Sequence, residues 1–181
     1  MGRIVSNFFI SLDGVTEAPD QWHFPYFNDE MGAAIGAGMQ EAAGFLMGRK
    51  LYDEWSAYWP TAEADQDFAE FINNTRKYVV SNTLEKADWN NTTVVSGDVV
   101  AKLREIKEQA DGDIEMSGSA TTVRWLLANG LLDELRLLVH PIVVGHGQRL
   151  FEGTPTHALK LVKSETFQTG VLNLAYVPAA G

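Results

Sequence analysis

The pattern that most constrains the fold is IEMSGSATTVRWLLANG, residues 114–130. It begins as a short apolar strand at 114–116 and turns through the small residues Ser117-Gly118-Ser119. Apolar side chains then recur at helical spacing, at Ala120, Val123, Leu126 and Leu127. Gly130 is placed to end that helix in a left-handed conformation. The segment therefore predicts a strand, a tight turn and a helix.

The turn between this strand and this helix has two interpretations. In the first, Gly118 only permits a tight turn and the serines only cap the helix. In the second, free backbone N–H groups and the positive end of the helix dipole form an anion site, most often for phosphate. This segment alone favours neither interpretation.

Length and composition limit the function classes. The chain has 181 residues, 45% of them hydrophobic and 21% charged, which is typical of one globular domain spanning 1–181. Its formal net charge of −10 and the lack of a basic stripe argue against nucleic-acid binding. No run is long enough to span a membrane, and there is no cysteine, so we expect a cytoplasmic protein without disulfides or thiolate sites.

Strand and helix patterns alternate along the first three quarters of the chain, and strands dominate afterwards. We expect strands at 3–12, 44–47, 76–81, 92–96, 114–116, 135–139, 158–167 and 171–178. We expect helices at 28–43, 48–55, 65–74, 98–106 and 120–130. The first strand is an almost continuous apolar run, which is typical of a central strand buried on both faces. The order predicts an α/β fold with a mainly parallel sheet and an antiparallel C-terminal edge.

The strand-turn-helix pattern recurs. Gly48-Arg49-Lys50 also follows a strand and opens a helix, and Ser81-Asn82 ends another strand. In a parallel sheet these turns lie together at the carboxyl ends of the strands, where open α/β sheets bind ligands. Two helix N-termini and an arginine suit a dinucleotide with a pyrophosphate and a 2′-phosphate. The Gly-x-Gly-x-x-Gly fingerprint is absent, which excludes the Rossmann type.

Five motifs in order carry a resemblance to a known family. They are Ser11-Leu12-Asp13-Gly14, Met47-Gly48-Arg49-Lys50-Leu51-Tyr52, Val79-Val80-Ser81-Asn82-Thr83-Leu84, Ser117-Gly118-Ser119-Ala120, and His140 through Phe151. Over nearly its whole length the chain resembles the dihydrofolate reductase superfamily, and most closely the reductase domain of riboflavin biosynthesis and its stand-alone relatives. The resemblance implies a three-layer fold around a central eight-stranded sheet, NADPH as hydride donor, and a homodimer.

The resemblance also implies roles for single residues. The cofactor-binding positions would be Gly48, Arg49, Lys50, Ser81, Asn82, Ser117, Gly118, Ser119, Ala120 and Thr121. Asp13 matches an acidic residue at the substrate end of the first strand, where it would orient the substrate or help supply the proton. Substrate contacts are expected from Asp13, Trp22, Gly145 and Gly147.

Each candidate also has a simpler interpretation. Asp13 could only form an Asx turn with Gly14, and Trp22 could belong to the core. Arg49 opposes the dipole of its own helix, which a bound anion would explain. The histidines share no metal-ligand spacing, so we predict no metal.

The residues and the resemblance together predict an NADPH-dependent reductase that acts on a small heterocyclic or carbonyl substrate. The resemblance implies a pyrimidine or pteridine compound, in an activity similar to that of 5-amino-6-ribosylaminouracil reductase. Two alternatives stay open at this point. One is a dihydrofolate or pterin reductase, in which Asp29 or Glu30 would supply the carboxylate. The other is a nucleotide-binding protein without catalysis on the same fold.

Overall fold

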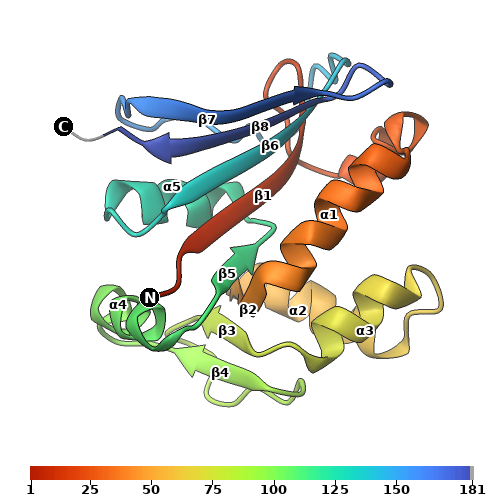
Figure 1. Cartoon of the computed structure of the whole chain (residues 1–181). Helices are drawn as coiled ribbons and strands as arrows, with labels where there is room; N and C mark the ends of the chain where they lie inside the picture. The colour runs from red at the N-terminus through yellow and green to blue at the C-terminus, as the bar shows by residue number, and fades with distance from the viewer. Residues whose placement is uncertain (180–181) are drawn as a thin grey trace.

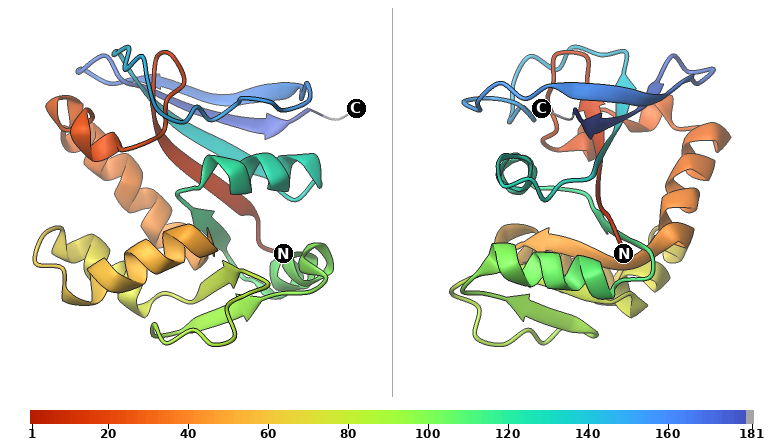
Figure 2. Two further views of the ribbon diagram at one scale, coloured as in Figure 1. Left: turned by 180° about the vertical axis from the view of Figure 1, so that it is seen from behind. Right: turned by 60° about the vertical axis from the view of Figure 1, so that its left-hand side comes forward.

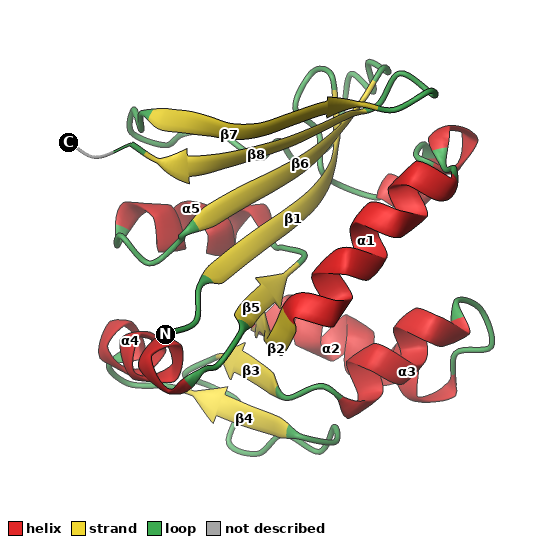
Figure 3. Cartoon of the chain, viewed as in Figure 1, coloured by secondary structure: helices red, strands yellow, loops and turns green. Residues whose placement is uncertain are grey.

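A computed structural model describes residues 1–179, and its strands form one eight-stranded sheet (Figures 1 and 3). The strands are β1 (Ile4–Ser11), β2 (Ala42–Gly48), β3 (Lys77–Val80), β4 (Thr92–Val95), β5 (Asp113–Met116), β6 (Glu134–His140), β7 (Leu159–Thr166) and β8 (Leu172–Pro178). The α-helices are α1 (Asp29–Glu41), α2 (Arg49–Tyr58), α3 (Gln66–Asn74), α4 (Val99–Gln109) and α5 (Ala120–Ala128). Short 3₁₀ turns occur at Pro19–Gln21, Phe24–Tyr26 and Trp59–Thr61.

The strand order is β4-β3-β2-β5-β1-β6-β8-β7. The first six strands of the chain pair in parallel, whereas β8 runs antiparallel to both β6 and β7. The predicted parallel sheet with an antiparallel C-terminal edge is confirmed. β1 lies between β5 and β6, as its continuous apolar run predicted.

Helices cover both faces of the sheet. Figure 2 shows α5 and α1 on opposite sides of β1. On one face, α4 and α5 pack on the largest apolar cluster, to which β1 contributes Ile4, Phe8 and Ile10. On the other face, α2 and α3 pack on Phe45 and Met47 of β2. Burying each of these large side chains stabilises the fold by roughly 1.5–3 kcal/mol.

The predicted helix ends follow from local capping. Asn28 accepts a hydrogen bond from the Met31 backbone at 3.0 Å and so begins α1. Gly130 has φ +64° and follows Asn129, the C-cap of α5, which confirms its predicted left-handed stop.

Several predicted boundaries differ from the structure by one to three residues, and α2 and α4 each extend three residues past their expected ranges, to Tyr58 and Gln109. The helix expected to reach residue 43 ends at Glu41, and β2 begins at once with Ala42 in place of residue 44. Ala42 already pairs with Asp113 of β5, and the register shifts between Ala42 and Gly44. The pairing with β5 therefore overrides the helical pattern, which the local sequence cannot reveal.

None of the helices within residues 1–179 combines the length and apolarity needed to cross a bilayer.

Candidate functional site

The three predicted turns lie side by side at one edge of the sheet. β3, β2 and β5 are consecutive neighbours, and Ser81, Gly48 and Ser117 stand at or directly after their carboxyl ends. Parallel pairing aligns these ends, with Gly48 opposite Val80. The strand order thus brings the three turns, which are far apart in the sequence, to the same edge of the sheet, as the sequence predicted.

Two helix N-termini converge at this edge. Gly48 precedes α2, and a Cβ added to it would lie 2.9 Å from Oγ1 of Thr122 in the first turn of α5. Ser119 caps α5 by accepting a hydrogen bond from the Thr122 backbone at 3.4 Å. The positive ends of both helix dipoles therefore lie close together, a favourable place for a ligand with more than one phosphate.

The turn before α5 has an unusual backbone. Gly118 has φ +133°, and the Gly118–Ser119 peptide bond is cis. Gly118 is buried and Ser117 is exposed. A φ in this region favours glycine, so this turn cannot carry an ordinary side chain at position 118 without strain.

Arg49 links the turn before α2 to the turn that follows β3. Its Nε donates to both carboxylate oxygens of Asp53, at 2.8 and 2.9 Å, and its Nη1 donates to Thr83 Oγ1 at 3.3 Å. Lys50 beside it pairs only loosely with Glu54, at 3.9 Å. Exposed ion pairs of this kind contribute at most about 1 kcal/mol, so a ligand phosphate could replace Asp53 at little cost.

The turn after β3 is held by its own side chains. Ser81 Oγ accepts hydrogen bonds from the backbones of Thr83 and Leu84, at 3.2 and 3.1 Å. Asn82 Oδ1 accepts from the Gly97 backbone at 3.0 Å. Both predicted residues thus shape the turn, and Thr83, which the sequence analysis did not place in the site, is the residue that meets Arg49.

A cleft of about 940 Å³ extends from the Ser117–Ala120 turn and from Lys50 along the face of the sheet that carries α1, while Gly48, Arg49, Ser81 and Asn82 are not among its lining residues. Ser117, Gly118, Ser119 and Ala120 line one end of it, and Thr16, Glu17 and Gln148 lie around the same region. α1 contributes Ala34, Ile35 and Gly38, and the opposite wall consists of Leu51, Trp55, Trp59, Phe68 and Phe71. The sequence analysis missed these wall residues. Their helical spacing was visible, but the same spacing also describes a helix that faces only core.

Asp13 binds the loop after β6. Its carboxylate accepts hydrogen bonds from Ser11 Oγ at 2.6 Å and from the backbones of Val144 and Gly145, at 3.0 and 2.8 Å. These hydrogen bonds, the one from Ser11 first, lower the pKa of Asp13 to about 2. Asp13 is therefore ionised at neutral pH, in a chemical state that cannot donate a proton.

The two predicted glycines of this loop have positive φ, +82° at Gly145 and +99° at Gly147. A Cβ on Gly147 would lie 3.1 Å from Val15. The loop is also held through the Gln148 backbone, which donates to Glu17 Oε2 at 2.6 Å. Both glycines thus allow the loop to lie against the segment that follows β1.

Trp22 lies behind the cleft. It is 8% exposed and packs edge-on against His140, with ring centroids 5.2 Å apart. His23 and His140 are buried beside it, and burial lowers the pKa of both, so both rings are neutral at pH 7. Within residues 1–179, no group of three or more His, Asp or Glu side chains is arranged to hold a metal ion.

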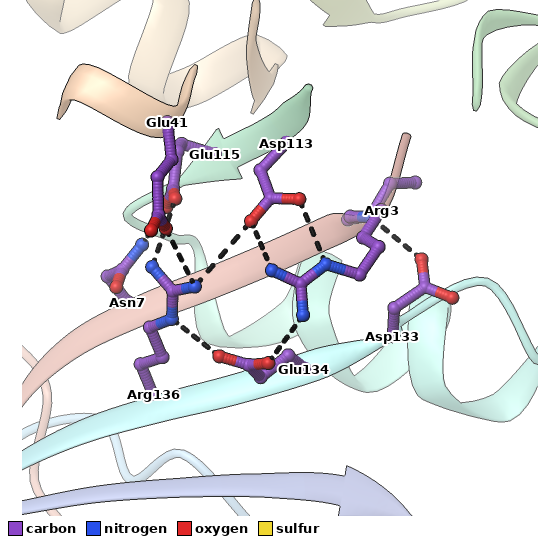
Figure 4. A network of polar contacts seen from close by, with 9 residues as sticks. Arg3, Asn7, Glu41, Asp113, Glu115, Asp133, Glu134 and Arg136 are labelled. Carbon is purple, nitrogen blue, oxygen red and sulfur yellow. Dashed lines mark hydrogen bonds and ion pairs between the residues drawn. The ribbon is translucent and has the colours of Figure 1, made fainter. Parts of the chain in front are cut away.

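A polar network, five residues of which line the cleft, lies at its far end (Figure 4). It consists of Arg3, Asn7, Glu41, Asp113, Glu115, Glu134 and Arg136. Glu115 accepts hydrogen bonds from Asn7 and from Arg136, and burial raises the pKa of its carboxyl to about 7 despite both partners. The sequence analysis missed this network because its members come from three strands and α1.

Comparisons with known proteins agree with this geometry. The model of the RibD C-terminal domain matches residues 3–173. The uncharacterized protein YyaP of Bacillus subtilis (strain 168) is 28% identical over 179 residues, which cover 96% of this chain and 94% of that protein.

Solved structures share the fold. The putative riboflavin biosynthesis protein from Shewanella sp. PV-4 matches with a TM-score of 0.80 and 20% identity, over 99% of this chain and 100% of that one. A pyrimidine reductase-like protein from Corynebacterium diphtheriae matches with a TM-score of 0.67 and 12% identity, over 99% and 93% of the two chains. A deaminase/5-amino-6-(5-phosphoribosylamino)uracil reductase from Thermotoga maritima matches with a TM-score of 0.67 and 15% identity, over 98% of this chain and 57% of that one. The family match covers nearly the whole sequence, and this chain therefore belongs to the RibD C-terminal domain family, the riboflavin-biosynthesis reductase type that its motifs resemble.

Proposed function

We propose that this protein is an NADPH-dependent reductase that transfers hydride to a small heterocyclic substrate of the pyrimidine or pteridine kind. The observation that carries the proposal is that three strand-end turns, two of them helix N-termini, lie on neighbouring strands, and that one of them, Ser117 through Ala120, lines a 940 Å³ cleft. The names of the structural relatives, a riboflavin biosynthesis protein and a pyrimidine reductase-like protein, support the substrate class.

The turns at the sheet edge suit the parts of such a cofactor. Ser117 through Thr121 would hold the pyrophosphate, because the first backbone N–H groups of α5 have no acceptor within the helix and Gly48 lets the neighbouring turn approach closely. Arg49, with Lys50, Ser81, Asn82 and Thr83 around it, would meet the 2′-phosphate. NADPH would supply the hydride when bound, and the protein would align the two reactants and exclude water.

Asp13 acts in this proposal as a positioning residue. Its ionised carboxylate fixes the loop that carries Gly145 and Gly147 beside the cleft. In this proposal the proton that accompanies hydride comes from another group or from water, in place of the donor role that the sequence suggested for Asp13.

Asp13→Asn tests this role. The amide oxygen can accept from only one of the Val144 and Gly145 N–H groups, while its NH₂ faces the other, so the loop should loosen. We expect faster proteolysis within residues 141–150 and a fall in kcat/KM of about tenfold or more. The pH profile between 5 and 9 should keep its shape, since a carboxyl with a pKa of about 2 does not titrate there. Loss of one limb of the profile would instead identify Asp13 as the proton donor.

The pterin alternative finds less support in the geometry. Glu30 accepts hydrogen bonds from Asn28 Nδ2 and from the Gln168 backbone, both at 2.8 Å, so it binds the β7–β8 hairpin. The residues of α1 that line the cleft beyond it are apolar until Glu41. A carboxylate in the middle of α1, as a dihydrofolate reductase would use, is not found among the described residues.

Equilibrium titration with NADPH and NADH tests the proposal, and substrate panels test the catalysis. We expect saturable binding of NADPH in preference to NADH, and oxidation of bound NADPH by a pyrimidine or pteridine compound. If neither dinucleotide binds, the proposal fails. If NADPH binds but no pyrimidine, pteridine or quinone-like compound oxidises it, the nucleotide-binding alternative without catalysis is favoured.

We further propose that the protein is a cytoplasmic homodimer. The chain lacks cysteine, which suits a reducing compartment. β7 is an edge strand with exposed apolar side chains, Leu161 at 48% and Val162 at 51%, which are typical of a surface that pairs. Light scattering should give twice the mass of one chain, and a monomer mass would contradict the dimer.

A further inference from the structure

The cleft as a whole is lined by more acidic than basic residues. Seven of its lining residues are Asp or Glu and three are Lys or Arg. Two of the carboxylates, Glu54 and Asp65, lie on the wall with the aromatic residues, while Glu41 and Glu115 lie at the far end. α1 also ends there without a basic residue in its last turn, so its C-terminal dipole adds to the negative potential.

The three cations of the cleft are all paired with carboxylates. Arg136 donates to Glu134 at 2.6 Å and Glu115 at 3.2 Å, and lies 3.4 Å from Glu41. Lys50 lies 3.9 Å from Glu54, and Lys163 lies 3.6 Å from Glu165. Among the residues that the structure describes, every Lys or Arg that lines the cleft thus has a carboxylate beside it. An anion that entered the cleft would find no unpaired positive charge.

The same region has an aromatic wall. Trp55 packs edge-on against Trp59 and Phe68, with ring centroids 5.9 and 5.6 Å apart. The indole N–H of Trp59 is buried and has no acceptor among residues 1–179. Across the cleft, α1 presents apolar residues from Ala34 to Met39, with Gly38 lying over Glu115, before it ends at Glu41. Flat faces opposite small residues leave room for a planar ring.

We infer that the substrate of this cleft is a flat aromatic ring compound that carries no phosphate group. The inference rests on the proposed function, because it assigns the turns to the cofactor and the remaining cleft to the substrate. Phosphate is bound at the positive end of the site, where helix N-termini converge with Arg49. Away from these turns a phosphate ester would face Glu54 on the wall and Glu41 at the far end, and it would lose its water without gaining a free cation.

Matched pairs of compounds that differ only in a phosphate test the inference. The first pair is 5-amino-6-(5-phosphoribosylamino)uracil and its dephosphorylated nucleoside, and the second is riboflavin 5′-phosphate and riboflavin. Calorimetric titration into protein saturated with NADP⁺ measures affinity without turnover. We expect the phosphate-free member of at least one pair to bind at least tenfold more tightly than its ester.

Two variants of equal charge change serve as test and control. Glu54→Gln removes a carboxylate from the wall and frees Lys50 from its ion pair. The ratio of the two affinities, phosphate-free compound over ester, should therefore fall at least threefold. Glu63→Gln removes an exposed carboxylate outside the cleft and should leave this affinity ratio unchanged. Equal or tighter binding of the ester by the unmodified protein would overturn the inference, and so would the absence of binding by every member of both pairs. If NADP⁺ itself does not bind, the proposed function fails, and the same pairs titrated into the free protein still decide between a phosphate-free and a phosphorylated ligand.

Discussion

Arg49→Ala is expected to weaken the binding of NADPH by about 10- to 100-fold, because one charge-assisted hydrogen bond to a phosphate contributes about 1.5–3 kcal/mol. NADH lacks the 2′-phosphate, so its affinity should change by no more than about twofold. Arg49 already spans from α2 to Thr83 and is held only by an exposed pair with Asp53. It can therefore turn to a phosphate at the end of β3 without disturbing the fold. Fluorescence titration of both dinucleotides measures the two affinities.

Arg104→Ala is the matched control for this substitution. Arg104 is exposed on α4, and its loss changes the net charge of the chain by the same amount. The control should leave both dinucleotide affinities unchanged at 0.15 M salt, where charges separated by more than about 8 Å are largely screened. Equal losses for NADPH and NADH in Arg49→Ala would remove Arg49 from the 2′-phosphate and assign it to a part that both cofactors share.

The three turns at the carboxyl ends of the strands could be predicted because each depends only on a few consecutive residues. The pattern is a glycine or serine after a short apolar strand, followed in two of the three turns by a helix. The strands are parallel, and parallel strands bring such turns together wherever they occur in the chain. Gly48, Ser81 and Ser117 therefore lie at one edge, as their sequence contexts predicted.

The cleft could not be predicted because its residues depend on long-range packing. Trp55 and Phe68 face the space beside α1, but an amphipathic pattern does not reveal whether a helix face meets core or cavity. Arg136 meets Glu115 only after β6 and β5 align on either side of β1.

The role of Asp13 also depends on distant contacts. Asp13 receives the backbone N–H of Val144, which is 131 residues away in the sequence. The sequence motif predicts that Asp13 lies at the end of the first strand. Its hydrogen-bond partners and its lowered pKa follow only from the fold.

Gly118→Ala is expected to reduce NADPH affinity 100-fold or more while the protein stays folded. A non-glycine residue at φ +133° carries strain on the order of 1–3 kcal/mol, which the turn would relieve by rotating its backbone N–H groups away from the pyrophosphate. The core should tolerate the new methyl group, because it would lie 3.6 Å from Phe8, an ordinary contact. Gly130→Ala is the control: it places the same methyl at φ +64° in open space at the other end of α5. That variant should lose about 1 kcal/mol of stability and no affinity. If Gly118→Ala binds NADPH as tightly as Gly130→Ala does, the turn is only a tight connection capped by its serines, and the pyrophosphate must bind elsewhere.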